Sequence, residues 1–287
     1  MAQKLETDKA KSLREIFAKI SEVAVLPQVV HKVIEISDSE DGSPADIEKA
    51  VEIDPGFCTK LIAMANSAQY SLPRRITSIR EASMMLGFKQ IRELALNAGV
   101  FDFFVGKNDK ESLRRRDWWR LSVDVASMSK WIASQVGINP YEAYTCGLLH
   151  IFGKTLIDQS DPTGYDKVMY VVQKGAPERL AERTIFAVDH VDVAQEMARS
   201  WRFPEALVEG INYLDDPRER EVEAPLAAVV NIGFTLVNVG RFGRPEDGQM
   251  PLASWALEIL RVDSMTAETW VEHAHQQFLK GANKPAA

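Results

Sequence analysis

The chain has 287 residues, of which 46% are hydrophobic and 26% are charged, so it can bury a large core and divide into two lobes. It contains no run of about eighteen apolar residues and no apolar N-terminal segment, so we expect neither a membrane span nor a secretory signal. The net charge of −7 disfavours a general nucleic-acid binder, and the two cysteines lie in apolar helical patterns, which is typical of reduced thiols in the cytoplasm.

Capping residues followed by proline mark several helix starts in the first half of the sequence. Ser43-Pro44 and Asp54-Pro55 each place an N-cap side chain before a proline, whose missing N–H would be unpaired in the first turn of a helix. Ser78 and Glu81 have the spacing of a capping box, and Gly87 suits the helix end that follows. With the hydrophobic periodicity, these signals predict helices over 1–22, from Leu26-Pro27, from Pro44, from Pro55 to Asn66, from Ser78 to Gly87 and from Phe88 to about Val105.

The polar, charged segment Gly106–Ser112 is the predicted boundary between an N-terminal helical lobe, residues 1–110, and a C-terminal helical lobe, residues 111–287. A long helix over Leu113–Val136 follows, and we expect its tryptophans to pack inward and Arg114–Arg116 to be solvated. Further helices are predicted over Tyr141–Lys154, from Asp161-Pro162, over 177–188, from Asp189 to Trp201, over Ala206–Leu214 and Ala224–Val239, and twice more before Lys280. No segment alternates like a strand, so the predicted fold class is all-α.

The segment Tyr141–Lys154 has the composition of a helix at the centre of a protein. Asn139-Pro140 suits its start, Gly153 suits its end, and nearly all residues between them are apolar or small. His150 is its one strongly polar side chain. A His-Asp metal motif would continue with Asp, but the next residue is Ile151. The missing carboxylate argues against a metal centre on this helix.

His150 and His190 are the candidates for a relic site, meaning the remainder of a catalytic or metal centre. A divalent metal needs three or four His or carboxylate ligands that converge on one point, and Asp124, Glu182 and Asp189 are the acids that could assist. The alternative is that both histidines are hydrogen-bonded within the core, since a buried ring without a partner is costly. We expect no catalytic residue, no bound metal and no cofactor.

Other catalytic or phosphate-binding signals are missing from the sequence. It has no Gly-x-Ser-x-Gly turn, no glycine-rich phosphate loop and no cation near either cysteine. Arg74 and Arg75 are adjacent in a predicted loop, where they could contact a phosphate or a partner, or simply be solvated. Asn66, at a predicted helix end, is a further candidate contact, although its amide could instead fix the turn that follows.

Short motifs follow one another in a fixed order along most of the chain. In the first half they are Leu26-Pro27, Asp54-Pro55, Ala65-Asn66-Ser67-Ala68 with Tyr70, Ile76–Ile79 and Leu86-Gly87. In the second half they are Trp119 with Ser122, Gly147-Leu148-Leu149-His150 with Gly153, and Asp189-His190 with Trp201 and Pro204. By these motifs the chain resembles the HDOD family, the HD-related output domains of bacterial signalling, and residues 20–239 together resemble one HDOD domain.

The resemblance implies an N-terminal helical lobe packed on a C-terminal lobe like that of HD-type phosphohydrolases, with an incomplete metal set. Leu121 stands about where the hydrolases have their first metal histidine, and Ile151 replaces the Asp of the His-Asp pair. Asn212–Asp215 stands where HD-GYP phosphodiesterases place histidines. Of the residues that bind metal in HD-type hydrolases, the resemblance implies that only His150 and His190 remain.

We therefore expect a non-enzymatic regulatory or interaction module of bacterial signal transduction, located in the cytoplasm and binding a protein partner. The alternative is an HD-type phosphohydrolase with an altered site, or a sensor that binds nucleotides or cyclic dinucleotides without cleaving them. Metal analysis would identify a hydrolase, and calorimetry against nucleotides would identify a sensor. We expect no membrane and no nucleic-acid partner.

Overall fold

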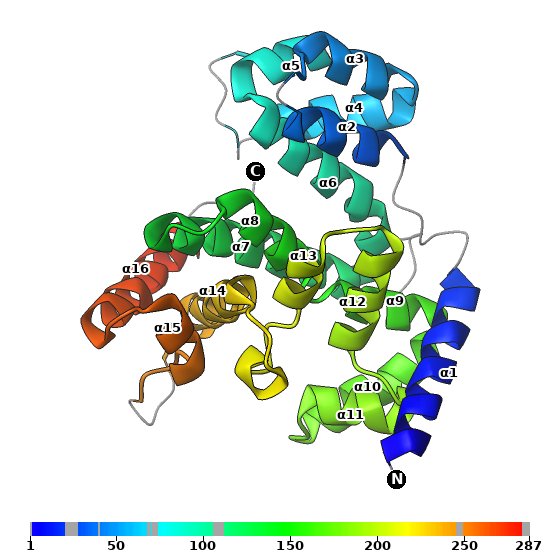
Figure 1. Cartoon of the computed structure of the whole chain (residues 1–287), viewed down its shortest axis with the longest axis vertical. Helices are drawn as coiled ribbons and strands as arrows, with labels where there is room; N and C mark the ends of the chain where they lie inside the picture. Colours follow the sequence, from blue (N-terminus) through cyan, green and yellow to red (C-terminus); the bar gives the residue numbers. More distant parts are fainter. Residues whose placement is uncertain are drawn as a thin grey trace. The chain divides into compact units, whose positions relative to one another are not determined.

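The computed structural model (Figure 1) describes residues 2–20, 28–39, 41–67, 70, 74–105, 112–244 and 249–282 of the chain. Contacts between Cα atoms divide the chain into two compact units. The larger unit comprises Met1–Ile20 and Leu113–Ala287, and the smaller unit comprises Ser21–Ser112. The described residues form helices and no strands, which confirms the all-α fold class.

The described part of the smaller unit contains α2 (Gln28–Asp38), α3 (Pro44–Glu52), α4 (Pro55–Ala65), α5 (Ile79–Leu86) and α6 (Phe88–Val105). Ser43, Asp54 and Ser78 cap α3, α4 and α5 as predicted, each accepting a hydrogen bond from a backbone N–H of the first turn. α3 packs against α2 and α5, and α6 packs against α2, α4 and α5. The predicted boundary Gly106–Ser112, except for its last residue, and the predicted helix start at Leu26-Pro27 lie outside the described residues.

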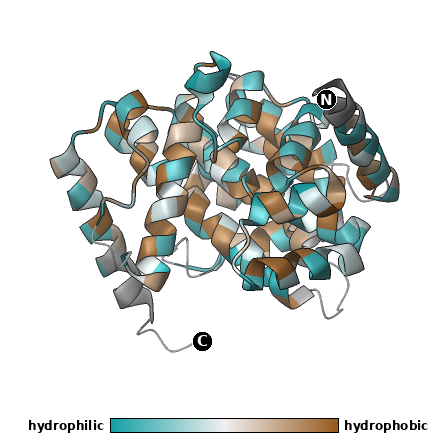
Figure 2. Ribbon diagram, turned by 90° about the horizontal axis from the view of Figure 1, so that it is seen from below, coloured by the Kyte–Doolittle hydropathy of each residue, from teal (hydrophilic) through white to brown (hydrophobic). Residues whose placement is uncertain are grey.

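Helices also make up the larger unit. They are α1 (Ala2–Ile20), α7 (Ser112–Val136), α8 (Pro140–Leu149), α9 (Phe152–Ser160), α10 (Pro162–Gln173), α11 (Glu178–Phe186), α12 (His190–Ser200), α13 (Glu205–Ile211), the 3₁₀ turn η2 (Pro217–Arg220), α14 (Pro225–Phe242), α15 (Ser254–Leu260) and α16 (Ser264–Ala282). Figure 2 shows hydrophobic and hydrophilic residues interleaved along most helices, the pattern of helices with one buried face.

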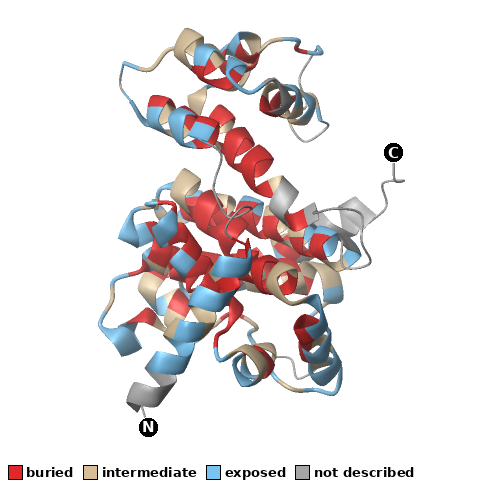
Figure 3. Ribbon diagram, turned by 90° about the vertical axis from the view of Figure 1, so that its right-hand side faces the viewer, coloured by how far each residue is buried: buried red, intermediate tan, exposed pale blue. Residues whose placement is uncertain are grey.

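α8 and α14 lie at the centre of the larger unit. Every residue of α8 from Ala143 to Leu149 is buried, and α14 packs against α8, α13, α15 and α16. Figure 3 shows that buried residues gather in the interior of the larger unit. A Cβ on Gly147 of α8 would lie 2.7 Å from Cα of Ala126, and a Cβ on Gly233 of α14 would lie 2.7 Å from Oγ of Ser129. These glycines therefore let α7 approach both central helices closely.

α14 is also the one described helix that is long and apolar enough to cross a membrane by length and composition. Within the larger unit, 56% of this stretch is buried. Four other helices pack against it, which is typical of the core helix of a globular protein.

α1 belongs to the larger unit, whereas the domain prediction placed it in the N-terminal lobe, residues 1–110. Its side chains Ile16 and Ile20 are buried, and the helix packs on α9. Nζ of Lys9 lies 2.5 Å from a carboxylate oxygen of Asp192 on α12. Apolar spacing shows that α1 has a buried face but not which helix covers it, so the sequence could not assign it to a unit.

The prediction of one helix over Tyr141–Lys154 is wrong, because the chain breaks at Ile151 between α8 and α9. Ile151 has φ −112° and ψ 10°, which interrupts the helical backbone. Gly153 is not a helix end but part of the first turn of α9, where a Cβ would lie 1.9 Å from the carbonyl oxygen of His190. Glycine is needed there because α9 packs closely on the start of α12.

The prediction that Arg114–Arg116 are solvated is wrong for the first two arginines. Arg115 is buried and lies 3.1 Å from Asp158, which is fully buried. Arg114 also contacts Asp158 and lies 2.5 Å from Asp166. A buried carboxylate needs such partners, and spacing along a single helix does not reveal them.

Candidate functional site

His150 lies at the junction of α8 and α9 and is fully buried. Its Nδ1 lies 2.6 Å from the carbonyl oxygen of Gly147, and because a carbonyl oxygen can only accept, Nδ1 must carry a proton. Burial lowers the pKa of His150 to about 3, so near neutral pH the ring is uncharged and Nε2 carries a lone pair. Nε2 has no hydrogen-bond partner among the described residues. The ring therefore presents a bare acceptor to its surroundings.

His190 is the first residue of α12, and a buried carboxylate orients it. Its backbone N–H and its Nδ1 lie 3.0 and 2.7 Å from Oε2 of Glu182, whose Oε1 accepts from the hydroxyl of Tyr165 at 2.9 Å. Burial disfavours the charged form of Glu182, but the His190 ring and the Lys154 ammonium outweigh burial and lower the pKa of Glu182. Nδ1 therefore donates to a carboxylate, and Nε2 of His190 has no partner in the described part of the chain.

The ring of Tyr213 lies near the rings of both histidines. The centroid of its ring lies 4.9 Å from that of His150 and 6.5 Å from that of His190. Phe234 of α14 packs edge-on against both His150 and Tyr213, at 5.6 and 5.0 Å. Asn231, also on α14, donates to the carbonyl oxygen of Tyr213 at 2.9 Å. The structure thus brings together the two histidines that the sequence singles out, in a buried and largely aromatic setting.

Ion pairs lie beside these histidines on α9, α11 and α12. Nζ of Lys154 lies 2.6 Å from Oε2 of Glu178, and Arg179 lies 2.7 Å from Asp189 and 2.5 Å from Asp215. Burial opposes ionisation of both aspartates, but Arg179 and nearby hydrogen-bond donors lower the pKa of Asp189 and of Asp215. These acids are therefore charged, and they tie α11 to the start of α12 and to the segment after α13.

The sequence matches the HDOD domain family over residues 23–217, most of the chain. The chain belongs to the HDOD family. A relative from Treponema pallidum, an uncharacterized protein, is 22% identical over 228 residues. The match covers 79% of this HDOD chain but 44% of the relative, so the chain spans less than half of that protein's length.

Solved structures share the fold of this HDOD protein. An HDOD domain protein of unknown function from Geobacter sulfurreducens is 23% identical with a TM-score of 0.77, over 96% of this chain and 98% of that chain. A provisionally assigned phosphohydrolase from Shewanella amazonensis is 25% identical with a TM-score of 0.68, over 93% and 97%. A protein from Marinobacter aquaeolei, provisionally assigned to signal transduction, is 19% identical with a TM-score of 0.70, over 96% and 66%.

The residues of the HDOD centre do not fit the metal cluster of HD-type phosphohydrolases. His150 and His190 offer two nitrogen ligands, but the apolar side chain of Ile151 is fully buried where a carboxylate would be required. Lys154, which pairs with Glu178, is close enough for its charge to act on His150 and Glu182. Among the described residues, no group of three or more His, Cys, Asp or Glu side chains is arranged to hold a metal ion. We therefore assign no metal-dependent step to this centre.

The other sequence candidates, Asn66, Arg74 and Arg75, belong to the smaller unit. The side-chain NH2 group of Asn66 donates to the carbonyl oxygen of Ile76 at 2.9 Å and to the carbonyl oxygen four residues earlier, on α4, at 3.0 Å. The side-chain oxygen of Asn66 accepts from the backbone N–H of Ile76 at 2.9 Å. These bonds use both amide protons, which supports the structural interpretation of Asn66. Arg74 pairs with Glu81 at 2.5 Å, and Arg75 is exposed. A ligand or partner at these residues stays a prediction.

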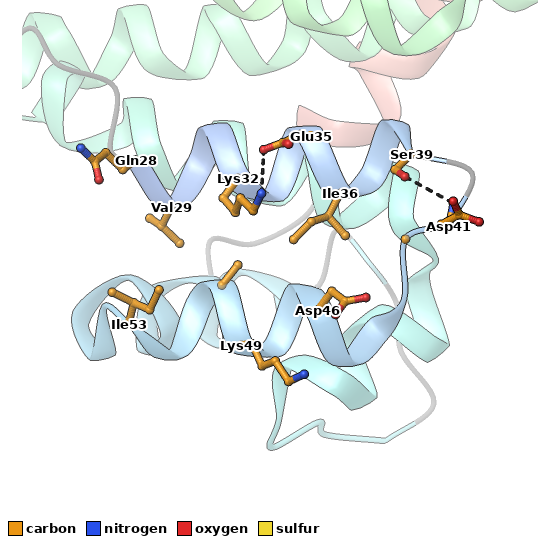
Figure 4. A pocket seen from close by; sticks show the side chains of 12 residues that line it. Gln28, Val29, Lys32, Glu35, Ile36, Ser39, Asp41, Asp46, Lys49 and Ile53 are labelled. Carbon is orange, nitrogen blue, oxygen red and sulfur yellow. Dashed lines mark hydrogen bonds and ion pairs between the residues drawn. The ribbon is translucent and has the colours of Figure 1, made fainter.

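A groove of about 720 Å³ runs between α2 and α3 of the smaller unit (Figure 4). Apolar side chains from both helices line it, and Ile53 at one end is 83% exposed. The apolar lining is Val29, Ile36, Ala50 and Ile53, and the charged lining is Lys32, Glu35, Asp41, Asp46 and Lys49. Two basic and three acidic side chains line the groove together, so its charge selects no single class of ligand.

Lys154 and Glu178 are part of the centre without belonging to any predicted ligand set. Helix periodicity does not show that α9, α11 and α12 meet, so the pairing of Lys154 with Glu178 has no local signal. The composition does contain a hint, because Lys154 follows a long apolar run four residues after His150. A lysine at the end of such a run is rarely buried unless it is paired.

Proposed function

We propose that this HDOD protein is a non-hydrolytic regulatory module of bacterial signal transduction that acts by binding a partner protein. The observation that carries the proposal is the composition of the histidine centre. Two imidazoles remain, but an isoleucine replaces the expected carboxylate and a lysine belongs to the same cluster. HD-type hydrolysis needs a metal held by several acids and histidines, so this ligand set supports a role other than catalysis.

A cytoplasmic location belongs to the same proposal. Cys58 and Cys146 are both free thiols, and Cys146 is buried in α8. Reduced, unpaired cysteines are the ordinary state in the cytoplasm.

The second candidate is an HD-type phosphohydrolase or nucleotide sensor. The observation that favours it is the 25% identity to the Shewanella amazonensis protein, which carries a provisional phosphohydrolase assignment. A sensor would retain binding of a nucleotide or cyclic dinucleotide at the histidine centre without turnover.

A hydrolysis assay separates these functions. The purified chain is incubated with Mn²⁺, Mg²⁺ or Zn²⁺ and either a chromogenic phosphodiester or a cyclic dinucleotide, beside a His150→Gln/His190→Gln variant. We expect the wild type to show no more turnover than the variant does. Metal-dependent turnover that disappears in the variant would identify a hydrolase.

Two binding measurements complete the test. In calorimetry against a nucleotide panel, the wild type should show no more heat of binding than the double variant does. Binding that depends on the histidines and occurs without turnover would identify a sensor. For the regulatory role, a protein captured from the native host should bind the purified chain again in a reconstituted pair with a measurable Kd. Failure of every captured protein to rebind would contradict it.

A further inference from the structure

The exposed side of α10 carries two apolar side chains between two lysines. Lys167, Tyr170, Val171 and Lys174 have the spacing of residues that share one face of a helix. All four are exposed, Tyr170 by 62%, and Nζ of Lys174 lies 5.6 Å from the centroid of the Tyr170 ring. The opposite face supplies the buried residues of α10. The exposed face is therefore not needed for the packing of α10 and is open to another molecule.

α11 adds a further exposed apolar side chain to the same helical hairpin. Leu180 is 60% exposed and shares a face of α11 with Arg183 and Thr184, which are exposed as well. α10 and α11 pack against each other (Figure 1). Of the nine large hydrophobic side chains that are exposed among the described residues, three lie within residues 170–180. Single apolar residues are ordinary at a protein surface, whereas a concentration of them marks a site of interaction.

The two exposed faces are positively charged, although the chain as a whole carries −7. Their charged residues are Lys167, Lys174 and Arg183. Arg183 pairs with Asp189 at 2.8 Å, whereas the ion pairs of the described residues include neither lysine. The two ammonium groups are therefore available to the acids of a partner.

The acids of α10 and α11 do not cancel these charges, because each already has a partner within the larger unit. The partners are Arg114 for Asp166, Lys154 for Glu178 and His190 for Glu182. Two of these pairs belong to the histidine centre. The helix whose outer face is open to a partner thus also orients His190 with its inner face.

We propose that the outer face of the α10–α11 hairpin, defined by Lys167, Tyr170, Val171, Lys174, Leu180 and Arg183, docks an acidic amphipathic helix of the partner protein. The apolar side of that helix covers the three apolar side chains, and its Asp or Glu residues pair with the two lysines. The twelve residues of α10 span about 18 Å, which about three turns of a partner helix match. This inference rests on the proposed regulatory function and names the chemistry of its partner.

An anionic membrane or a nucleic acid would also attract the lysines, but the surface is too sparsely charged for either. Segments that bind anionic lipid carry clusters of about four to eight Lys or Arg, and affinity for nucleic acid grows with the number of phosphates contacted. The hairpin offers two lysines outside ion pairs beside three apolar side chains. This ratio fits an acidic, apolar protein segment.

Fluorescence anisotropy on the full chain tests the proposal with a defined probe. The probe is a labelled peptide of about fifteen residues, with Leu along one face of a helix and Glu elsewhere, and its counterpart has Lys in place of Glu. We expect the acidic peptide to bind about tenfold or more tighter than the basic one. Lys167→Glu/Lys174→Glu should remove this preference, and Tyr170→Asp should weaken binding of the acidic peptide about tenfold. The substituted side chains are exposed, so both variants should keep a Tm close to that of the wild type.

Two control variants make matched changes on other surfaces. Lys32→Glu/Lys49→Glu alters the charge equally at exposed positions of the smaller unit, and Met265→Asp replaces an apolar side chain that is 81% exposed on α16. Both should bind the acidic peptide as the wild type does. Equal binding of the two peptides by the wild type, or equal losses in the control and hairpin variants, would overturn the proposal. Binding of phosphatidylglycerol vesicles or of a single-stranded oligonucleotide at the hairpin in place of the peptide would overturn it as well.

The failure of this inference is distinct from the failure of the proposed function. A captured host protein that rebinds the Lys167→Glu/Lys174→Glu variant as tightly as the wild type would support the regulatory role and overturn docking at the hairpin. Hairpin-dependent binding of the acidic peptide, with no captured host protein that rebinds, would contradict the regulatory role and support the docking surface.

Discussion

Asn66 shows how one polar side chain at a helix end can hold the segment beyond it. Its amide spans ten residues to bond both backbone groups of Ile76, which is itself buried. Asn66→Ala leaves the N–H and C=O of Ile76 without these partners, so we expect a loss of about 1–3 kcal/mol in the free energy of unfolding, measured in urea. Arg75→Ala, at an exposed position, should change it by less than about 0.5 kcal/mol. Equal stability of Asn66→Ala and the wild type would contradict the structural role.

The second residue-scale prediction concerns pH and His150. Its pKa is about 3 in the folded chain and 6.5 when exposed, so between these values the unfolded chain binds a proton that the folded chain does not. Stability should therefore fall as pH drops below 6.5, by up to about 1.4 kcal/mol per pH unit from this residue. Glu182 and Asp189 have lowered pKa values, and their contributions fade only near and below their ordinary values of 4.5 and 3.8.

The measurement is denaturant unfolding at several pH values between about 5 and 7, where those carboxylates remain charged. His150→Asn keeps a polar side chain but cannot take up a proton in this range. The variant should be less stable than the wild type at about pH 7 and should lose less stability on acidification. Parallel pH profiles for the two proteins would show that His150 is not held neutral by the fold.

At this scale the sequence identifies the histidines but not their partners. The apolar run of α8 and the Asp189 cap of α12 are local features, so His150 and His190 stand out as polar residues in buried helices. Glu182 precedes His190 by eight residues, and no helical or turn spacing links them. Their contact exists because α11 and α12 fold back on each other, which periodicity cannot predict.

At the scale of elements, helix starts are predicted well and one helix end is not. Ser43, Asp54 and Asp189 act through bonds within three residues, so the sequence suffices to place them. Gly153 has a glycine's signal for a helix end, yet it lies inside α9 because His190 of another helix occupies the space of a Cβ. A local rule fails there because a tertiary contact decides the residue.

Substitution of that glycine gives the element-scale prediction. Gly153→Ala places a methyl group where the His190 carbonyl oxygen would lie 1.9 Å away, so α9 and α12 must separate. We expect a loss of about 1–3 kcal/mol, seen as a lower Tm, despite the better helix propensity of alanine. Gly233→Ala is the comparison and should lower the Tm less, because the Ser129 hydroxyl at 2.7 Å can rotate away and the nearest backbone atom, N of Ser129, lies at 3.2 Å. A Tm for Gly153→Ala equal to or above that of Gly233→Ala would contradict close packing of α9 on α12.

At the scale of the whole molecule, the chain begins in the larger unit, passes through the smaller one and returns. α1 thus contributes to a unit whose remaining residues start at Leu113. The sequence predicts the amphipathic helix and a boundary near residue 110, since both are local patterns. It does not predict which unit α1 joins, because no pattern within α1 or α9 shows that their apolar faces pack against each other.

Hydrogen exchange on the full chain tests this assignment. Ile16→Asp places a charge in the buried contact of α1, so α1 should open and its amides should exchange about 100-fold faster. Because α1 packs on α9, amides of α9 should also exchange faster, while those of α2 to α6 in the smaller unit should keep their wild-type rates. Ala18→Asp, at an exposed position of the same helix, should leave all these rates nearly unchanged. Faster exchange in α2 to α6 with α9 unaffected would place α1 in the smaller unit instead, since only helices that lose a packing partner lose protection.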